Sequence, residues 1–391
     1  MNTRDVTTAT ADRVSAPDDL PMPSARPEGA PTPDIDAGAG MAAGRSIHPS
    51  SQPALVDRLQ RAITYLRVSV TDRCNYRCTY CMPEDGVDHV GRSDILSFEE
   101  IVALVRCFVD LGVTRVRLTG GEPTVRRDLV DLVRLLRAVP GLRDIALSTN
   151  GHLLAELALP LRQAGVDRLN VSVDTLDPAK FARITRRGEL ARVLAGLAAA
   201  RAAGFASIKL NAVAIKGFND GEVGALCQFA FDNGFVPRFI EQMPMADGAL
   251  FVPGTLLSAA EIRGLIAASY PDHKLVASDG AAAAGGGPAR YHRLVPLGAP
   301  TPVSGREIGL ITPMTEHFCD TCNRVRLSST GALHTCLAHD DAVDLRSVLH
   351  ARGPSGVTAA IRDALTNKRD GHNFQLIGLG GPRKAMVQIG G

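Results

Sequence analysis

Short apolar runs and longer amphipathic stretches alternate along the chain from residue 64 onward. The amphipathic stretches at residues 98–111 and 189–203 repeat apolar positions with helical spacing. The first of them opens on the capping-box pair Ser97 and Glu100 and stops at Gly112. The apolar runs have the length and composition of buried strands and end in polar residues. Six of them are predicted as strands, at residues 65–70, 115–118, 145–148, 169–173, 208–213 and 238–242.

This alternation predicts an α/β fold. Strands that are separated by helices form parallel sheets, and six such units predict a partial (βα)6 barrel of the TIM type. Beyond the barrel, short strand-like runs at residues 291–295 and 307–311 indicate a smaller α+β extension. We therefore predict a barrel domain at residues 56–275 and a C-terminal domain at residues 276–391.

The first 55 residues are rich in Pro, Ala, Gly and Ser and show no hydrophobic period. Such a composition cannot bury enough apolar surface to fold. Residues 1–55 are therefore predicted to be a disordered tail without a catalytic role. The run of small residues at 279–288 is predicted to be a flexible loop inside the C-terminal domain.

The 391-residue chain has a formal net charge of +2, with acids and bases evenly mixed. This balance argues against nucleic acid or a membrane as a bulk partner. No apolar run approaches the roughly 20 residues of a membrane span, and residues 1–14 lack the apolar core of a secretory signal. We therefore expect a cytoplasmic protein, whose thiols stay reduced.

Six of the eight cysteines fall into two sets of three, whereas Cys107 and Cys227 lie in apolar helical stretches and are predicted to be core residues. The first set, Cys74, Cys78 and Cys81, has C-x3-C-x2-C spacing. Three thiolates at this spacing can hold three corners of a four-iron cluster and leave one iron open to a small molecule. A partial zinc site is the alternative, but zinc prefers two C-x2-C pairs or a Cys/His mixture.

Polar residues gather where the predicted strands end, which is where barrel enzymes carry their chemistry. The second strand runs into a Gly-Gly-Glu turn at residues 120–122, and its glycines allow close approach of a ligand to the backbone. A plain tight turn is the alternative. Arg67, Arg117 and Lys209 lie within strands, where a buried cation needs an anion. They predict a strongly anionic substrate such as a polyphosphate, unless Lys209 sits on an edge strand with a solvated face.

The second cysteine set has C-x2-C-x13-C spacing and consists of Cys319, Cys322 and Cys336. A second iron–sulfur cluster with an open iron and a zinc site both fit this spacing, and the first set favours the cluster. For zinc, the fourth ligand would be one of three histidines, His317, His334 or His339. Arg324 and Arg326 follow directly and project on one side of an extended strand. They are predicted to clamp the substrate, with a solvated charged edge as the alternative.

The first cysteine set, with the aromatic residue Tyr80 inside it, resembles the signature of the radical S-adenosylmethionine (SAM) superfamily. With both sets, the chain resembles the GTP 3′,8-cyclases, the radical SAM enzymes that open molybdenum cofactor biosynthesis. The resemblance runs from about residue 65 to the end of the chain and rests on residues 66–69, 117–123, 170–174, 238–241, 319–324 and 390–391.

The resemblance implies the conversion of GTP to (8S)-3′,8-cyclo-7,8-dihydroguanosine 5′-triphosphate. In that reaction a 5′-deoxyadenosyl radical takes hydrogen from the ribose C3′, and C3′ then attacks guanine C8. The alternatives are a peptide-modifying radical SAM enzyme with an auxiliary cluster, a two-cluster electron-transfer protein, and a zinc-stabilised binding module. The first usually carries more C-terminal cysteines. The second leaves the open irons, the glycine turn and the basic strand residues unexplained. Anaerobic iron and sulfide counting would distinguish the third.

The resemblance also implies two [4Fe-4S] clusters, one on each cysteine set, and SAM as cofactors. Contacts to SAM would come from Tyr80, Gly121, Ser172 and Met243. Contacts to GTP would come from Arg67, Arg117, Ser148, Lys209, Arg324, Val325 and Arg326. The family usually has threonine where Ser148 stands, so the hydroxyl is kept. Direct roles in catalysis would fall to Arg67, Lys209, Arg324, Arg326, Gly390 and Gly391.

The chain closes on Gly390 and Gly391, and the preceding residues 386–389 alternate apolar and polar positions, as a docked extended strand does. Two residues without side chains can enter a narrow cavity, and the resemblance implies that this tail reaches the active site. A frayed chain end is the alternative.

Beyond GTP as the substrate, the resemblance implies two partners. One is an electron donor of the flavodoxin or ferredoxin type. The other is the next enzyme of the pathway, cyclic pyranopterin monophosphate synthase, to which the product would be handed over. A monomer and a homodimer both fit the sequence.

Overall fold

A computed structural model describes residues 55–246, 248–278, 287–299 and 306–389. These described residues all belong to one compact unit. Three predictions fall wholly or mostly outside the described residues: the tail at 1–55, the loop at 279–288, and the closing pair Gly390 and Gly391.

The six predicted barrel strands are present and lie side by side in sequence order, each parallel to the next. The predicted partial barrel is therefore confirmed, with strand ends that differ from the prediction by one or two residues. The strands are β1 (Tyr65–Ser69), β2 (Arg115–Thr119), β3 (Asp144–Thr149), β4 (Arg168–Ser172), β5 (Ile208–Ala214) and β6 (Val236–Glu241).

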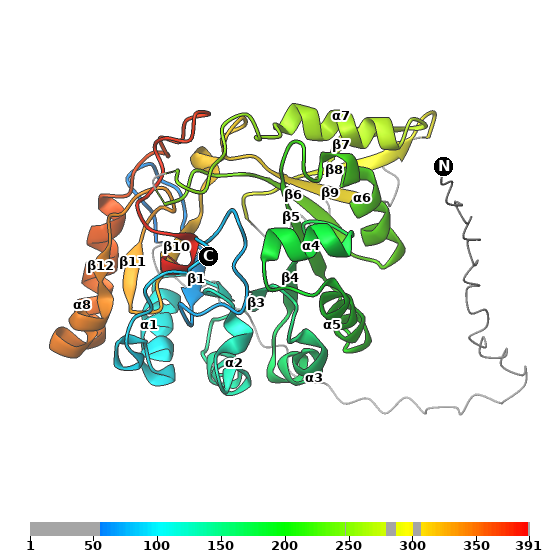
Figure 1. Ribbon diagram of the computed structural model, residues 1–391. Helices are drawn as coiled ribbons and strands as arrows, with labels where there is room; N and C mark the ends of the chain where they lie inside the picture. The colour runs from blue at the N-terminus through cyan, green and yellow to red at the C-terminus, as the bar shows by residue number, and fades with distance from the viewer. Residues whose placement is uncertain (1–54, 247, 279–286, 300–305, 390–391) are drawn as a thin grey trace, which may run out of the picture. The chain divides into compact units, whose positions relative to one another are not determined.

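Six α-helices connect these strands, and α1, α2, α3 and α5 line one side of the sheet in Figure 1. They are α1 (Phe98–Asp110), α2 (Leu129–Arg137), α3 (Leu154–Ala164), α4 (Pro178–Thr185), α5 (Leu190–Ala202) and α6 (Val223–Asp232). The predicted capping box forms at the start of α1, where Ser97 accepts from the Glu100 backbone N–H and Glu100 accepts from that of Ser97. No helix in the described part of the chain is long and apolar enough to cross a membrane.

The helices and strands share one hydrophobic core, whose members include Leu66, Val68, Leu118 and Leu147, all fully buried. Cys107 on α1 and Cys227 on α6 belong to the same core, with 2% and 0% of their surface exposed. The prediction that these two cysteines serve packing is therefore confirmed.

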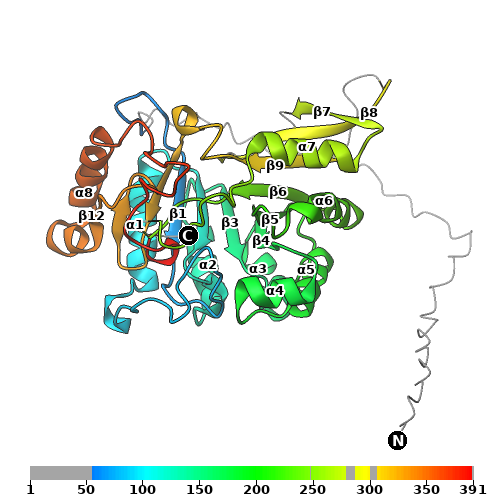
Figure 2. The ribbon, with the colours of Figure 1, turned by 45° about the horizontal axis from the view of Figure 1, so that its top comes forward.

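The C-terminal part of the chain extends the sheet at both of its ends. Next to β6 come β9 (Glu307–Ile311), β8 (Arg290–Pro296) and β7 (His273–Ser278), which lie beside α7 (Ala259–Ser269) in Figure 2. On the other side, β10 (Arg324–Leu327) runs parallel to β1. It is followed outward by β11 (Ala332–His334) and β12 (Val343–Asp344), and α8 (Leu345–Thr366) packs against α1.

This arrangement gives a twelve-stranded sheet within the described residues. The α+β extension was predicted, but its return to β1 was not. The boundary predicted between residues 275 and 276 falls inside β7, because this strand pairs with β8 without interruption. The division into a barrel domain and a C-terminal domain therefore stays a proposal.

The prediction of an extended strand at residues 386–389 is wrong. Residues Met386–Gln388 form a 3-10 helix, and Ile389 follows its end. The alternation has another cause: Val387 and Ile389 are 2% and 0% exposed while Gln388 is exposed. Val387 packs against Met82, which follows the first cysteine set directly. The segment is docked, as predicted, but in a helical turn.

Candidate active site

A cavity of about 340 Å³ lies at the carboxyl ends of the barrel strands. Residues from β1 to β6, from the C-terminal extension and from the closing segment all line it. Both cysteine sets face this one space. The lining residues that had been predicted for the site are Arg67, Cys74, Cys78, Tyr80, Cys81, Arg117, Gly121, Ser148, Ser172, Met243, Cys319, Cys322, Arg324, Arg326 and Cys336.

The first cysteine set lies on a tight loop directly after β1. The Cys81 backbone N–H donates to the Cys78 carbonyl at 3.0 Å, and the Tyr76 N–H donates to the Cys74 sulfur at 3.4 Å. Burial raises the pKa of Cys74 to about 11 and that of Cys81 to about 12. A cluster iron at this place would supply the positive charge that favours the thiolate form of these cysteines. The three residues therefore fit an iron–sulfur cluster.

The Gly-Gly-Glu turn after β2 fixes the position of this loop. The Gly121 N–H donates to the Thr71 carbonyl at 2.9 Å, and the Glu122 N–H donates to the Arg73 carbonyl at 2.8 Å. A Cβ on Gly120 would lie 2.4 Å from the Thr71 oxygen, and one on Gly121 would lie 2.3 Å from that of Arg73. Both glycines are required because the two backbones approach each other too closely for any side chain.

The buried carboxylate of Glu122 stabilises the same turn by accepting hydrogen bonds. It is 1% exposed and accepts from the Thr124 N–H at 3.0 Å, the Asn150 N–H at 2.6 Å and the Thr149 hydroxyl at 2.7 Å. Burial raises the pKa of Glu122 in spite of these donors. We read Glu122 as a residue that ties β2 to β3.

Replacing Gly121 with alanine should push the first cysteine loop away from β2 and lower iron binding at this loop. About half of the iron per chain is expected to be lost, because a four-iron cluster needs all three cysteines in place. Iron and sulfide determination after anaerobic reconstitution measures this.

Gly264→Ala is the matched control for that experiment. Gly264 lies in α7 and a Cβ there meets no atom within 4 Å, so alanine should be neutral or slightly stabilising. Full iron content in the Gly121→Ala protein would contradict the steric argument.

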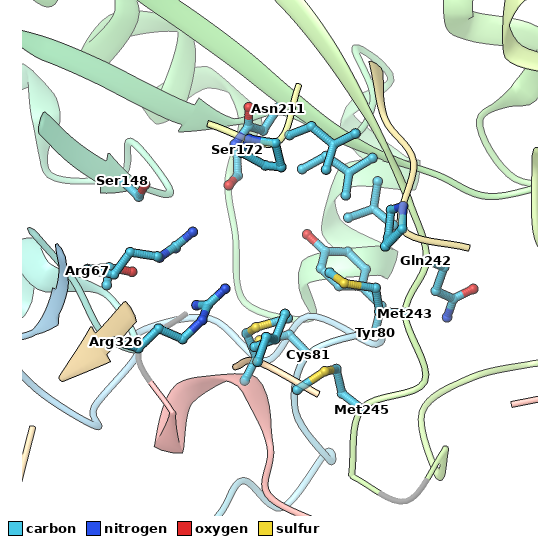
Figure 3. Close-up of a pocket in the computed structure, with 18 of the residues that line it drawn as sticks. Arg67, Tyr80, Cys81, Ser148, Ser172, Asn211, Gln242, Met243, Met245 and Arg326 are labelled. Atoms are coloured by element: carbon cyan, nitrogen blue, oxygen red, sulfur yellow. The ribbon is translucent and has the colours of Figure 1, made fainter. Parts of the chain in front are cut away.

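The residues predicted to contact SAM all line the cavity. Figure 3 shows Tyr80, Met243 and Cys81 near one another, with Ser172 across the cavity. The Tyr80 hydroxyl donates to Asp174 at 2.8 Å, and Asp174 also accepts from the Val213 N–H at 2.8 Å. Burial raises the pKa of Asp174 to about 6. Asp174 was not selected from the sequence, although its place at the end of β4 could have suggested it.

Arginine side chains form the opposite wall of the cavity. Arg67 on β1 and Arg326 on β10 are partners in the register of the two strands, and both point into the cavity in Figure 3. Burial and the neighbouring charges of Arg326 and Arg117 hold the pKa of Arg67 well below its usual range. Burial and Arg324 likewise lower the pKa of Arg326 to about 10. Such a cluster repels itself until an anion binds.

Two residues predicted to bind the substrate do not line the cavity. Val325 is 1% exposed and belongs to the hydrophobic core, because it points away from Arg324 and Arg326 on the same strand. Lys209 is 6% exposed, and its amine donates to the Tyr291 hydroxyl at 2.9 Å and lies over that ring. The alternative of a solvated edge does not apply to Lys209, because β5 lies between β4 and β6.

Arg238 on β6 does line the cavity but had not been selected as a site residue. It is 4% exposed, donates to the Asn170 side chain, and stands in register with Asn211. Its Nε, like those of Arg67 and Arg117, has no hydrogen-bond partner within the described residues. An arginine inside a buried strand was a signal in the sequence that could have identified it.

The second cysteine set flanks β10 and β11, with Cys319 and Cys322 before these strands and Cys336 after them. Burial would raise the pKa of Cys322, but Arg324 and Lys368 bring it down to about 7. The Arg324 guanidinium lies 3.9 Å from the Cys322 sulfur. Among the residues described, no three His, Cys, Asp or Glu side chains converge to hold a single metal ion, whereas a four-iron cluster takes each sulfur at a different iron.

The histidines considered as zinc ligands have other surroundings. His317 pairs with His372 at 3.1 Å, and His339 contacts the Gly371 carbonyl at 3.0 Å. His334 is 1% exposed, and burial lowers its pKa to about 4. None of these three histidines lines the cavity, whereas the three cysteines do, together with His372.

Comparison with known proteins gives similarity along almost the whole described chain. The family models described as Radical SAM superfamily and as Molybdenum Cofactor Synthesis C match residues 68–230 and 236–374. The GTP 3′,8-cyclase of Pseudomonas entomophila (strain L48) is 45% identical over 328 residues, which are 83% of this chain and 94% of that protein. The GTP 3′,8-cyclase of Pelotomaculum thermopropionicum is 44% identical over 338 residues, or 86% of this chain and 99% of that protein.

Among solved structures, that of Streptococcus suis SuiB bound to S-adenosylmethionine covers 81% of this chain and 72% of its own, at 15% identity and a TM-score of 0.49.

Proposed function

The chain belongs to the GTP 3′,8-cyclase family of radical SAM enzymes, and from that membership we propose how its residues serve the reaction. The reaction is the radical SAM-dependent cyclisation of GTP in molybdenum cofactor biosynthesis, with a [4Fe-4S] cluster and SAM as cofactors. When bound, these cofactors would supply the radical chemistry that removes hydrogen from the ribose C3′. The C3′ atom then bonds to guanine C8. One observation carries the proposal: two three-cysteine sets and a cluster of buried and half-buried arginines face a single cavity.

We propose that Cys74, Cys78 and Cys81 hold the SAM cluster, with Tyr80, Gly121, Ser172 and Met243 around SAM. A second [4Fe-4S] cluster on Cys319, Cys322 and Cys336 would take the guanine ring. The triphosphate of GTP would neutralise the arginine wall, with Ser148 contacting the substrate from β3. The lining residues that supply the positive charge are Arg67, Arg117, Arg238, Arg324 and Arg326.

We further propose that Gly390 and Gly391, which lie outside the described residues, help to position GTP. The segment before them supports this: Met386 lines the cavity and Val387 packs beside the first cysteine loop. Figure 1 places the red C-terminal segment next to β1 and β10. A flavodoxin- or ferredoxin-type electron donor, hand-over of product to cyclic pyranopterin monophosphate synthase, and a cytoplasmic location complete the proposal.

The function is tested by anaerobic reconstitution followed by incubation with SAM, a strong reductant and GTP that carries deuterium at C3′. Mass spectrometry should find a cyclised nucleotide and 5′-deoxyadenosine that has gained the deuterium. Formation of 5′-deoxyadenosine without deuterium, and without a cyclised nucleotide, would contradict this function.

Lys209 does not line the cavity, but its charge is expected to act on GTP at longer range and to make GTP binding depend on pH. Burial, then the charges of Arg238, Arg168 and Arg117, lower the pKa of Lys209 to about 7. The triphosphate favours the protonated amine, so its pKa rises on binding. At pH 8 the amine is largely neutral in the free enzyme and protonated in the complex, and binding takes up a proton.

Affinity for GTP should therefore fall as the pH rises above 7, by up to about tenfold per unit. Calorimetry at pH 8 in two buffers of different ionisation enthalpy measures the proton uptake. Lys209→Met should abolish the uptake and weaken binding about tenfold or more. Equal uptake by the wild-type and Lys209→Met proteins would assign the proton to another group.

A further inference from the structure

Lys368 is a buried cation behind the second cysteine set. It is 2% exposed and lies just after α8. Its ammonium group donates to the Arg324 carbonyl at 3.3 Å and to the Thr335 carbonyl. Within the described part of the chain, no carboxylate forms an ion pair with it, in contrast to its neighbours Arg369 and Asp370, which pair with Asp341 and Arg58. Burying an ammonium group without an anion costs free energy, so another interaction should offset this cost.

The two carbonyls that Lys368 contacts belong to the two segments that carry Cys322 and Cys336. Arg324 follows Cys322 by two residues, and Thr335 directly precedes Cys336. One ammonium group therefore joins these segments at points next to both cysteines. A lysine that only capped α8 would donate to the last carbonyls of that helix, whereas these two acceptors lie at β10 and just after β11.

A second buried cation holds the remaining cysteine in the same way. The Arg61 guanidinium donates to the Cys319 carbonyl and to the Asp370 carbonyl, both at 2.8 Å, and to that of Arg369 at 2.9 Å. Arg61 is itself paired with the buried carboxylate of Asp57. Its positive charge is thus matched within the protein, whereas that of Lys368 is not. Backbone carbonyls at or beside all three cysteines of the set are therefore bound by the side chains of Arg61 and Lys368.

We propose that Lys368 is a positioning residue for the second cysteine set: it holds Cys322 and Cys336 in place and offsets the negative charge of the ligated cluster. The inference rests on the second cluster proposed above. Three thiolates on a four-iron core leave the assembly with a net negative charge, and nearby charge sets how readily such a cluster is reduced. The cluster is then the anion that makes the buried ammonium tolerable, and outer-shell partners of this kind govern metal retention.

The test uses the full chain with Cys74, Cys78 and Cys81 replaced by alanine, so that only the second cluster can form. Lys368→Met removes the charge and the donors but keeps the chain length. Iron loss to a chelator should become about tenfold faster or more, and the midpoint potential followed by electron paramagnetic resonance should shift to more negative values. Lys368→Arg, which keeps the charge, should restore most of the potential.

The matched control is Lys274→Met, which removes the same charge from an exposed position on β7 and should change neither quantity. If Lys368→Met does not fold, Lys368→Gln replaces it in both measurements, because it keeps an N–H donor without the charge. Unchanged iron loss and potential in a folded Lys368 variant would overturn the inference and leave the second cluster standing. A parent protein with Lys368 intact that binds no iron would overturn both.

Discussion

Replacing Cys78 with alanine is expected to abolish cleavage of SAM, to below the detection limit for 5′-deoxyadenosine. Cys78 sits between two residues whose backbone N–H groups anchor the loop, Arg77 to the Thr185 carbonyl at 3.0 Å and Thr79 to that of Ile184 at 2.9 Å. The loop therefore cannot shift to bring a substitute ligand forward. With one of three ligands gone, about four iron atoms per chain should be lost.

The control for Cys78→Ala is Cys227→Ala. Cys227 lies on α6 in the hydrophobic core and is 0% exposed. Its truncation to alanine should lower the stability of the fold slightly by leaving a small cavity. The iron content should stay unchanged. Measurable 5′-deoxyadenosine formation by the Cys78→Ala protein would remove Cys78 from the role of cluster ligand.

The barrel could be predicted because its signals are local. Each of the strands β1 to β6 is an apolar run that ends in polar residues, and the helix α1 has its own capping box. The first cysteine set is also local, since residues 74–81 lie on one loop. Patterns within about ten residues predict each strand and helix and their order along the chain. The helices between the strands then predict that the strands pair in parallel.

The rest of the site depends on contacts between residues far apart in the chain. β10 pairs with β1, and this places Arg326 beside Arg67. The sequence of neither strand predicts this pairing. The helical turn at Met386–Gln388 shows the same limit, because alternation over four residues describes a docked turn as well as a strand. Lys209 was rightly predicted to be buried, but only the tertiary structure shows its amine directed to Tyr291.

Buried carboxylates in this site serve the backbone. Glu241 is 0% exposed and accepts from the N–H groups of Ala259 at 2.9 Å, Met314 at 2.7 Å and Thr315 at 3.0 Å. It thereby joins the end of β6 to the start of α7 and to the loop after β9. Together with Glu122 and Asp174, it keeps negative charge bonded to the scaffold. The arginines of the cavity wall are then left to meet the charge of the substrate.

Replacing Cys322 with alanine should separate the two halves of the reaction. The first cysteine set lies on its own loop and stays intact, so cleavage of SAM should remain detectable. The second set loses the cysteine whose sulfur lies 3.9 Å from the Arg324 guanidinium. If the second cluster binds the guanine ring as proposed, its loss should lower the amount of cyclised nucleotide by about a hundredfold or more.

Iron content and deuterium transfer in the Cys322→Ala protein test whether SAM cleavage and cyclisation can be separated in this way. Iron should drop by about four atoms per chain while the remaining cluster keeps its spectroscopic response to SAM. Deuterium transfer from C3′ of GTP to 5′-deoxyadenosine should become weak, because the substrate is no longer held in one orientation. Cys107→Ala, which alters a core cysteine on α1 that is 2% exposed, should retain both iron and product. If Cys322→Ala loses its iron yet cyclises GTP at the wild-type rate, the second site has no part in the chemistry, and the arginine wall alone must orient the substrate.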